Sequence, residues 1–152
     1  MGLDMYLNAK RYVSDYSPKD AELRTELDKL TPLTAGLQIR EVTVETMYWR
    51  KANAIHKWFV DNVQNGVDDC GEYPVSVEQL RTLADLCEKV ATDLSPELLP
   101  TAGGFFFGST DYNEWYYADL LKTADRLNEL LNDKNVVDGQ YAIYDFVYTS
   151  SW

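Results

Sequence analysis

The densest group of side chains that could do chemistry lies in residues 48–58, in the run YWRKANAIHKW. A helix through this run would place Trp49, Asn53 and His56 on one face, with Arg50 on a neighbouring flank. A histidine beside an asparagine and an arginine could orient an anionic ligand or act as a general base near neutral pH. A lone histidine next to a core stripe is more commonly a packing residue, and both interpretations stay open.

A second group is the glycine-rich run Gly103–Gly108, which encloses three phenylalanines. Glycines let backbone amides approach a phosphate, but bulky rings fill this turn and no lysine follows it, so the phosphate-loop pattern is absent. We expect Phe105–Phe107 to pack as a brief strand or loop. One ring, such as that of Phe106, is then available to a ligand or partner.

A third group is a row of carboxylates near the C-terminal end. Asp125, Glu129 and Asp133 recur every four residues, which on a helix spaces them about 6 Å apart and imitates a row of phosphates. With Glu114 and the aromatic Trp115, this row could face the basic surface of a nucleic-acid-binding protein. The alternative is a solvated helix face moderated by neighbouring basic residues.

Metal and thiol chemistry have weaker signals. The acids Asp68 and Asp69, or Asp111 with Asp119, could bind a metal, although loop and capping roles are commoner for such acids. Two cysteines and one histidine do not complete an ordinary zinc site, so no metal or cofactor is predicted.

The cysteines themselves are expected to be free thiols in a reducing cytosol, with Cys87 on an apolar helix face. A Cys70–His56 thiol site is a further alternative.

Composition bounds the class of protein. The chain has 152 residues, 45% of them apolar, and is expected to form one domain over 1–152. Its 25 acids against 14 lysines and arginines give a net charge of −11, which disfavours direct binding to nucleic acid or anionic lipid. The sequence predicts neither a membrane span nor a signal peptide. No catalytic set is complete, so an enzyme is not the leading expectation.

The pattern of elements predicts an α+β fold with a small antiparallel sheet and about four helices, in the order β-α-β-α-α-α-β. The terminal strands should meet in the middle of the sheet or pair together, with the helices on one face. Expected are a strand over Leu3–Val13, a helix from Ser17-Pro18 with a Leu23, Leu27 and Leu30 stripe, a strand over 37–46, a helix over 48–63, a helix behind a Ser76–Gln79 capping box, a helix behind an Asp111–Glu114 capping box, and a strand over 140–149.

Three segments carry a resemblance to a known family: Tyr48–Val60, Leu98–Thr101 with Gly104–Gly108, and the terminal Ser150–Trp152. Together with the opening MGLDMYL, they resemble a family of small proteins encoded by tailed phages and bacterial prophages. The resemblance covers the whole chain, but that family has no established activity, so no residue inherits a role from it.

The resemblance implies a setting in the cytoplasm of a host cell. Small accessory phage proteins commonly bind a host protein, so the leading expectation is a protein that binds and inhibits or modulates a host or defence protein. The alternative is a small-molecule or nucleotide-handling domain, binding or enzymatic, with a site around Arg50, Asn53 and His56. A third is a structural or dimeric phage component; the sequence does not predict the oligomeric state.

Overall fold

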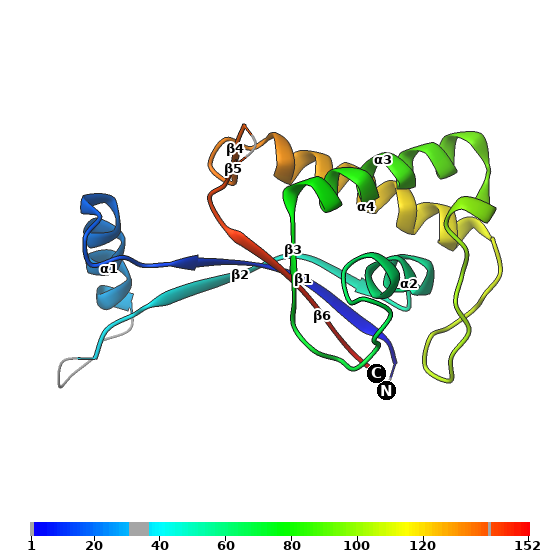
Figure 1. The fold of residues 1–152 in the computed structure, drawn as a ribbon, viewed down its shortest axis with the longest axis horizontal. Helices are drawn as coiled ribbons and strands as arrows, with labels where there is room; N and C mark the ends of the chain where they lie inside the picture. Colours follow the sequence, from blue (N-terminus) through cyan, green and yellow to red (C-terminus); the bar gives the residue numbers. More distant parts are fainter. Residues whose placement is uncertain (1, 31–36, 140) are drawn as a thin grey trace.

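The computed structural model describes residues 2–30, 37–139 and 141–152. In these ranges the chain forms the predicted α+β fold, with a four-stranded antiparallel sheet in the order β2-β1-β6-β3, a two-stranded β4-β5 ribbon and four α-helices (Figure 1). The elements are β1 (Asp4–Tyr12), α1 (Pro18–Leu30), β2 (Glu41–Arg50), α2 (Asn53–Asn62), β3 (Tyr73–Val75), α3 (Val77–Asp93), the 3₁₀ turn η1 (Pro96–Leu98), α4 (Glu114–Asn132), β4 (Val137–Asp138), β5 (Tyr141–Ala142) and β6 (Asp145–Ser151).

The first and last strands pair in the centre of the sheet, as the sequence predicts. β1 and β6 are antiparallel from Asp4 opposite Ser151 to Lys10 opposite Asp145. Along β1 the side chains at positions 3, 5, 7 and 9 are buried and the alternate ones are half-exposed, which is the burial pattern of a sheet with one covered face.

Helices α2, α3 and α4 cover that face, and α3 and α4 run antiparallel to each other (Figure 1). The predicted capping box starts α3, because Ser76 accepts from the Gln79 amide while the Gln79 side chain accepts from the Ser76 amide. The box predicted for α4 is wrong. Asn113 caps that helix instead of Asp111, since its side chain accepts from the amides of Trp115 and Tyr116.

The boundary between β2 and α2 also differs from the prediction. β2 runs to Arg50 and not to position 46, so Tyr48 and Trp49 belong to the sheet and the helix begins only at Asn53. The run fits a helical period, but hydrogen bonding to β1 along the whole strand decides the outcome. Thr46 is an extra residue opposite the Leu7/Asn8 step of β1, a bulge that leaves Thr46 and Met47 buried in succession.

Two short strands, β3 and β4, escape prediction. β3 lies at the sheet edge and contains Pro74, as edge strands tolerate. The strand predicted over 140–149 divides into β5, which pairs with β4, and β6, which continues to Ser151; its predicted start, Gln140, lies outside the described residues.

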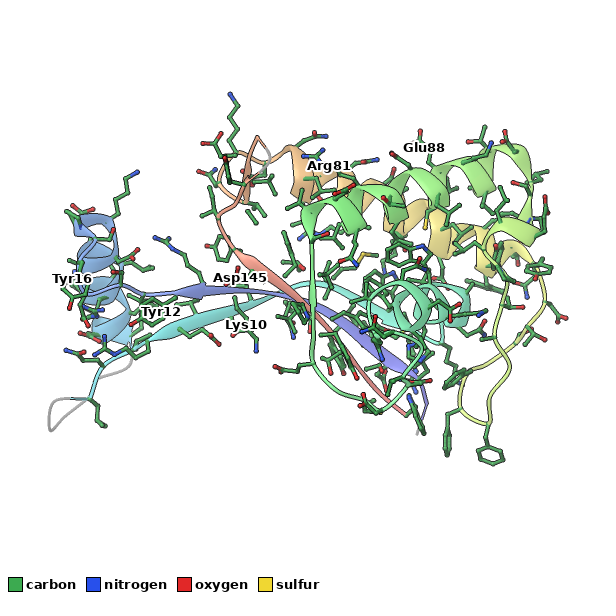
Figure 2. The ribbon with its side chains drawn as sticks, in the orientation of Figure 1. Lys10, Tyr12, Tyr16, Arg81, Glu88 and Asp145 are labelled. Atoms are coloured by element: carbon green, nitrogen blue, oxygen red, sulfur yellow. The ribbon has the colours of Figure 1, made fainter. Side chains whose placement is uncertain are left out.

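Helix α1 stands apart from the other helices, at the outer end of the ribbon formed by β1 and β2 (Figure 1). Tyr12 and Tyr16 mark this end of the molecule and are 61% and 96% exposed (Figure 2). The predicted leucine stripe of α1 therefore does not face the core: Leu23 and Leu27 are half-buried and Leu30 is 80% exposed.

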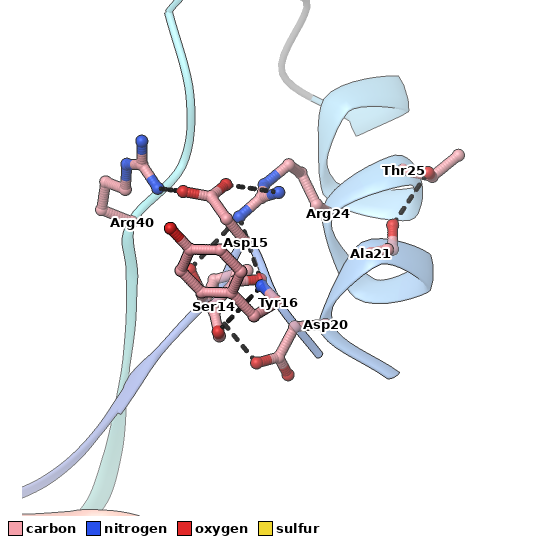
Figure 3. Close-up of polar contacts among 9 residues, drawn as sticks. Ser14, Asp15, Tyr16, Asp20, Ala21, Arg24, Thr25 and Arg40 are labelled. Atoms are coloured by element: carbon pink, nitrogen blue, oxygen red, sulfur yellow. Dashed lines mark hydrogen bonds and ion pairs between the residues drawn. The ribbon is translucent and has the colours of Figure 1, made fainter. Parts of the chain in front are cut away.

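Polar contacts hold α1 in place. Asp20 is 5% exposed and pairs with Arg11, and its other carboxylate oxygen accepts from the Ser14 amide at 2.9 Å. Asp15 pairs with Arg24 at 3.0 Å and with Arg40 from the start of β2 (Figure 3). We call α1 and the outer end of the β1–β2 ribbon the arm. The packing of α1 in this arm depends on hydrogen-bonded ion pairs more than on apolar burial.

Both cysteines are free thiols, Cys70 exposed and Cys87 buried. Burial raises the pKa of the Cys87 thiol to about 12, so this residue packs as a small apolar side chain in the α3 stripe. In the described part of the chain, no helix combines the length and the apolar character that crossing a bilayer requires.

The ion pairs of the arm predict a titration. The hydrogen bond from Arg40, reinforced by Arg24, lowers the pKa of Asp15 below its ordinary 3.8. Because the folded pKa is the lower one, the contact stabilises the arm fully above pH 3.8 and is lost as pH falls through the folded pKa. Carboxyl-detected NMR should show Asp15 titrating below 3.8 and moving upward in Arg40→Gln, but not in the exposed control Lys19→Gln. Titration of wild-type Asp15 at or above 3.8 would contradict the ion-pair account.

Candidate functional site

Trp49 lies in the interior and not on a ligand-binding helix face. Its indole is 2% exposed, and its Nε1–H donates to the Thr123 hydroxyl of α4 at 2.8 Å. That hydroxyl in turn donates to the Asp119 carbonyl at 2.6 Å. Trp49 therefore joins the sheet to α4, and its role is packing with a satisfied indole N–H.

Asn53, also predicted as a ligand residue, is 3% exposed and holds a loop in place. Its amide nitrogen donates to the carbonyls of Phe107 and Ser109 at 2.9 and 2.8 Å, and its amide oxygen accepts from the Ala102 amide at 3.1 Å. These three bonds tie both sides of the glycine-rich loop to the start of α2. The side chain has little bonding capacity left for a ligand.

His56 is the centre of a buried chain of hydrogen bonds. Its Nδ1 lies 2.7 Å from the Tyr148 hydroxyl, and its Nε2 lies 3.0 Å from Asp68 Oδ2. The other Asp68 oxygen accepts from the indole N–H of Trp152 at 3.1 Å. Burial, with the Asp68 charge nearby, raises the pKa of Tyr148 far above its usual range, so its hydroxyl keeps the proton and can donate it to Nδ1. A neutral imidazole with its proton on Nε2 satisfies both bonds.

This arrangement joins an acid, a histidine and a hydroxyl, but a substrate cannot reach it. His56 is 1% exposed and Tyr148 is 0% exposed. Phe107 packs edge-on against the imidazole, and Phe59 stacks on the Tyr148 ring. A general base must lie within hydrogen-bonding reach of a substrate proton, so the geometry supports a packing role for His56. Both ring nitrogens are occupied, which leaves none for a Cys70 thiolate.

The partners of His56 were not predicted. Tyr148 lies 92 residues away and Asp68 lies 12 residues away in sequence. The alternation of the last strand does place Tyr148 on the same face as Phe146, but whether it meets His56 depends on the position of α2 over the sheet. Asp69, by contrast, has the expected loop role, accepting from the Gly71 amide and the Tyr73 hydroxyl.

Arg50 is the predicted ligand residue that the structure leaves accessible. It is exposed at the end of β2 and lines a cavity of about 330 Å³ between the start of α2, the 101–113 loop and the first turns of α4. The cavity is lined by Arg50, Lys51, Ala52, Asn53, Ala54, Ile55, Thr101, Gly108, Ser109, Asp111, Asn113, Trp115, Tyr116, Asp119 and Leu120. Trp49, His56 and Phe106 are not among these residues.

The α4 wall of this cavity carries a carboxylate that sequence reasoning considered only as half of a metal pair. Asp119 is half-buried, and desolvation raises its pKa, offset in part by Lys122. Tyr116 beside it donates its hydroxyl to the Leu99 carbonyl at 2.7 Å, which fixes the loop to α4. The cavity is therefore lined by two cations, Arg50 and Lys51, and by two acids, Asp119 from α4 and Asp111 from the loop before it.

The phenylalanine run forms a packed loop and not a strand. A turn from the Gly104 carbonyl to the Phe107 amide closes it, and Phe107 packs against the core while Phe105 is 96% exposed. Phe106 is half-buried, and its carbonyl accepts from the Leu3 amide at 3.0 Å. The exposed ring is thus that of Phe105.

The acidic row lies beside a groove between β2 and α4. Two adjoining hollows of about 910 and 380 Å³ share Glu45, Thr46, Arg126 and Glu129, and we call them together the α4 groove. Asp125 lines the first hollow, Glu129 lines both, and Asp133 lines the second. The three acids therefore border a concave surface, with Asp125 and Glu129 on α4 and Asp133 at the C-cap of that helix.

The groove has an apolar floor and a charged rim. Leu121, which the sequence assigned to the core stripe, is 49% exposed in it, and Val44 is 41% exposed. Four carboxylates line it, those three and Glu45, against the cations Lys122 and Arg126. Arg126 is already committed, because it donates to the Thr46 carbonyl at 2.8 Å and to Glu129 at 2.6 Å.

The other two predicted partner residues lie elsewhere. Glu114 and Trp115 are exposed at the start of α4, where Trp115, 72% exposed, lines the cavity and not the groove. Comparisons of this chain with protein-family models, with curated proteins and with solved structures find no match.

The buried hydrogen-bond chain predicts a stability effect. Tyr148→Phe removes one hydroxyl and leaves His56 Nδ1 buried without a donor, which should lower the free energy of unfolding by about 1–3 kcal/mol. Urea unfolding measures the change, and Tyr16→Phe, whose ring is 96% exposed, is the control and should change it by less than about 0.5 kcal/mol. Equal stability of Tyr148→Phe and wild type would rule out the buried bond.

Proposed function

We propose that this chain is an accessory protein of a phage or prophage that binds, and thereby inhibits or modulates, a host or defence protein. The α4 groove is the feature that supports a binding role. It is concave, its floor exposes Leu121 and Val44, and carboxylates outnumber cations along it by four to two. Apolar area surrounded by a charged rim is the usual anatomy of a protein interface.

The chemistry of the groove selects a basic partner. Asp125 and Glu129 lie one turn apart on α4, and Asp133 is the C-cap residue that follows the helix, so the three acids match a partner segment that carries lysines or arginines at similar intervals. Arg126 neutralises part of Glu129, which leaves the outer two acids as the main charges that a partner would meet. Complementary charge speeds association and makes it salt-dependent.

The proposed partner is a protein surface that itself binds nucleic acid. Such surfaces carry basic side chains at phosphate spacing, whereas nucleic acid itself would be repelled by the acidic row. The phage setting rests on the resemblance of Tyr48–Val60, the 98–108 region and Ser150–Trp152, and the binding role rests on the groove.

The test is an affinity capture from bacterial lysate with three baits. In the groove bait, Asp125, Glu129 and Asp133 are changed to Lys. The control bait changes Glu78, Asp85 and Glu88 to Lys, three exposed acids of α3, so that the net charge changes equally. Glu88 lies on the outer side of α3 (Figure 2).

We expect a specific host protein that wild type and the α3 control retain and that the groove bait loses. Titration of that purified protein should then give an affinity that the groove changes weaken by at least roughly tenfold and that added salt also weakens. Equal retention by the groove bait, or capture of no specific protein by wild type, would overturn the proposed function.

A further inference from the structure

The cavity beside Arg50 is separate from the α4 groove and has a different chemistry. It lies against the first turns of α4, around Trp115 to Leu120, whereas the groove borders residues 118–133 of the same helix. Its volume of about 330 Å³ is at the lower end of the range of small-molecule sites, about 300–1,000 Å³. A ligand that fills it is small.

Two cationic residues at the junction of β2 and α2 line one wall of the cavity. Arg50 and Lys51 line it, and neither side chain forms an ion pair or hydrogen bond within the described ranges. Lys51 has the left-handed backbone angle φ 58°, and its amide donates to the Leu3 carbonyl at 2.8 Å. Non-glycine residues in this conformation are uncommon and gather at functional sites.

Gly108 leaves the room that the Lys51 side chain occupies. It has φ 84°, and a Cβ at this position would lie 3.1 Å from Lys51 Cβ and 3.3 Å from Lys51 Cδ. The loop that Asn53 holds in place is therefore packed directly against the lysine stem.

The same wall offers free backbone donors. Residue Ala52, which precedes α2, has no side chain to cap the helix, and the amides of Ala54 and Ile55 have no acceptor in the described part of the chain. Both residues line the cavity. With the two cations, these amides suit a compact anionic group such as a phosphate.

The α4 wall of the cavity suits a base. The Asp119 carboxyl lines it, is half-buried and has no hydrogen-bond partner among the residues described. A carboxylate accepts from the ring or exocyclic N–H groups of a nucleobase. The Trp115 ring, 72% exposed at this wall, provides an aromatic surface on which a base could stack.

We propose that this cavity binds a mononucleotide, with its phosphate against Arg50, Lys51 and the start of α2 and its base against Asp119 and Trp115. The site stands independently of the α4 groove, because none of the three carboxylates of the acidic row lines it. A nucleotide can bind to the groups of both walls, whereas free phosphate or a nucleoside can bind to those of only one.

The experiment is calorimetric titration of the purified full chain with the common ribonucleoside monophosphates, the matching nucleosides and inorganic phosphate. Variants are Arg50→Gln combined with Lys51→Gln for the cationic wall, and Asp119→Asn for the base wall. The control combines Lys19→Gln with Arg81→Gln, two exposed cations outside any ion pair in the described ranges; Arg81 lies on α3 (Figure 2). Thermal unfolding checks that each variant is folded.

We expect at least one monophosphate to bind with a Kd below about 1 mM, and the nucleoside and free phosphate to bind at least roughly tenfold more weakly. The double cation variant should lose at least roughly tenfold in affinity, Asp119→Asn should change the ranking of the bases, and the control should match wild type. Absence of nucleotide binding, equal binding by free phosphate, unaltered base ranking in Asp119→Asn, or unchanged affinity in the cation variant would each overturn the proposal. None of these outcomes bears on the α4 groove, whose test uses other residues.

Discussion

The backbone of Leu3, at the start of the central strand, connects the segments from which both candidate surfaces are built. Its amide donates to the Phe106 carbonyl of the glycine-rich loop, and its carbonyl accepts from Lys51 at the junction of β2 and α2. One residue later, the backbone of Asp4 lies opposite Arg50 of β2 on one side and Ser151 of β6 on the other in the strand register. Pairing of the two chain ends thus fixes the loop, the cation wall and the last strand against each other. Because these contacts join residues far apart in sequence, the arrangement exists only in the completed sheet.

Three large polar side chains between the sheet and the helices are compatible with burial because each has hydrogen-bond partners. Trp49, Asn53 and His56 all have residue types that sequence reasoning associates with ligands, and each is satisfied by Thr123, by loop backbone or by Tyr148 and Asp68. A buried donor or acceptor without a partner costs about 1–3 kcal/mol, so such residues must be hydrogen-bonded in place. Their role is to align α2, α4 and the loop, and the groups left free to meet a ligand are the exposed ones beside them.

What the sequence predicts well is what depends on neighbours along the chain. The alternation of β1, the Ser76–Gln79 box and the four-residue spacing of Asp125, Glu129 and Asp133 all follow from local geometry, and the structure has them. Tyr48 and Trp49 were misassigned because their helical spacing competes with pairing to β1, and pairing is invisible in a single segment. The cavity was beyond prediction for the same reason. Arg50, Gly108 and Asp119 lie on three separate segments, and only the folded chain brings them to one opening.

Helix α4 borders two proposed sites, a cavity for an anionic ligand and a groove for a basic partner. The two are compatible because solvent and salt screen the charges of one site from the other. Helical rise is about 1.5 Å per residue, so Asp125 and Glu129 lie about 9 and 15 Å along the axis from Asp119, a carboxylate of the cavity. At physiological salt the screening length is about 8 Å, so the effect of both acids on the potential at the cavity is reduced, and that of Glu129 more strongly. The net charge of −11 therefore determines the long-range repulsion between this molecule and a polyanion. It does not determine the local electrostatic potential that acts on a phosphate beside Arg50 and Lys51. Binding in the cavity therefore depends on the hydrogen-bond donors that line it. The α4 groove, which lies farther along the helix, presents its carboxylates to a basic partner.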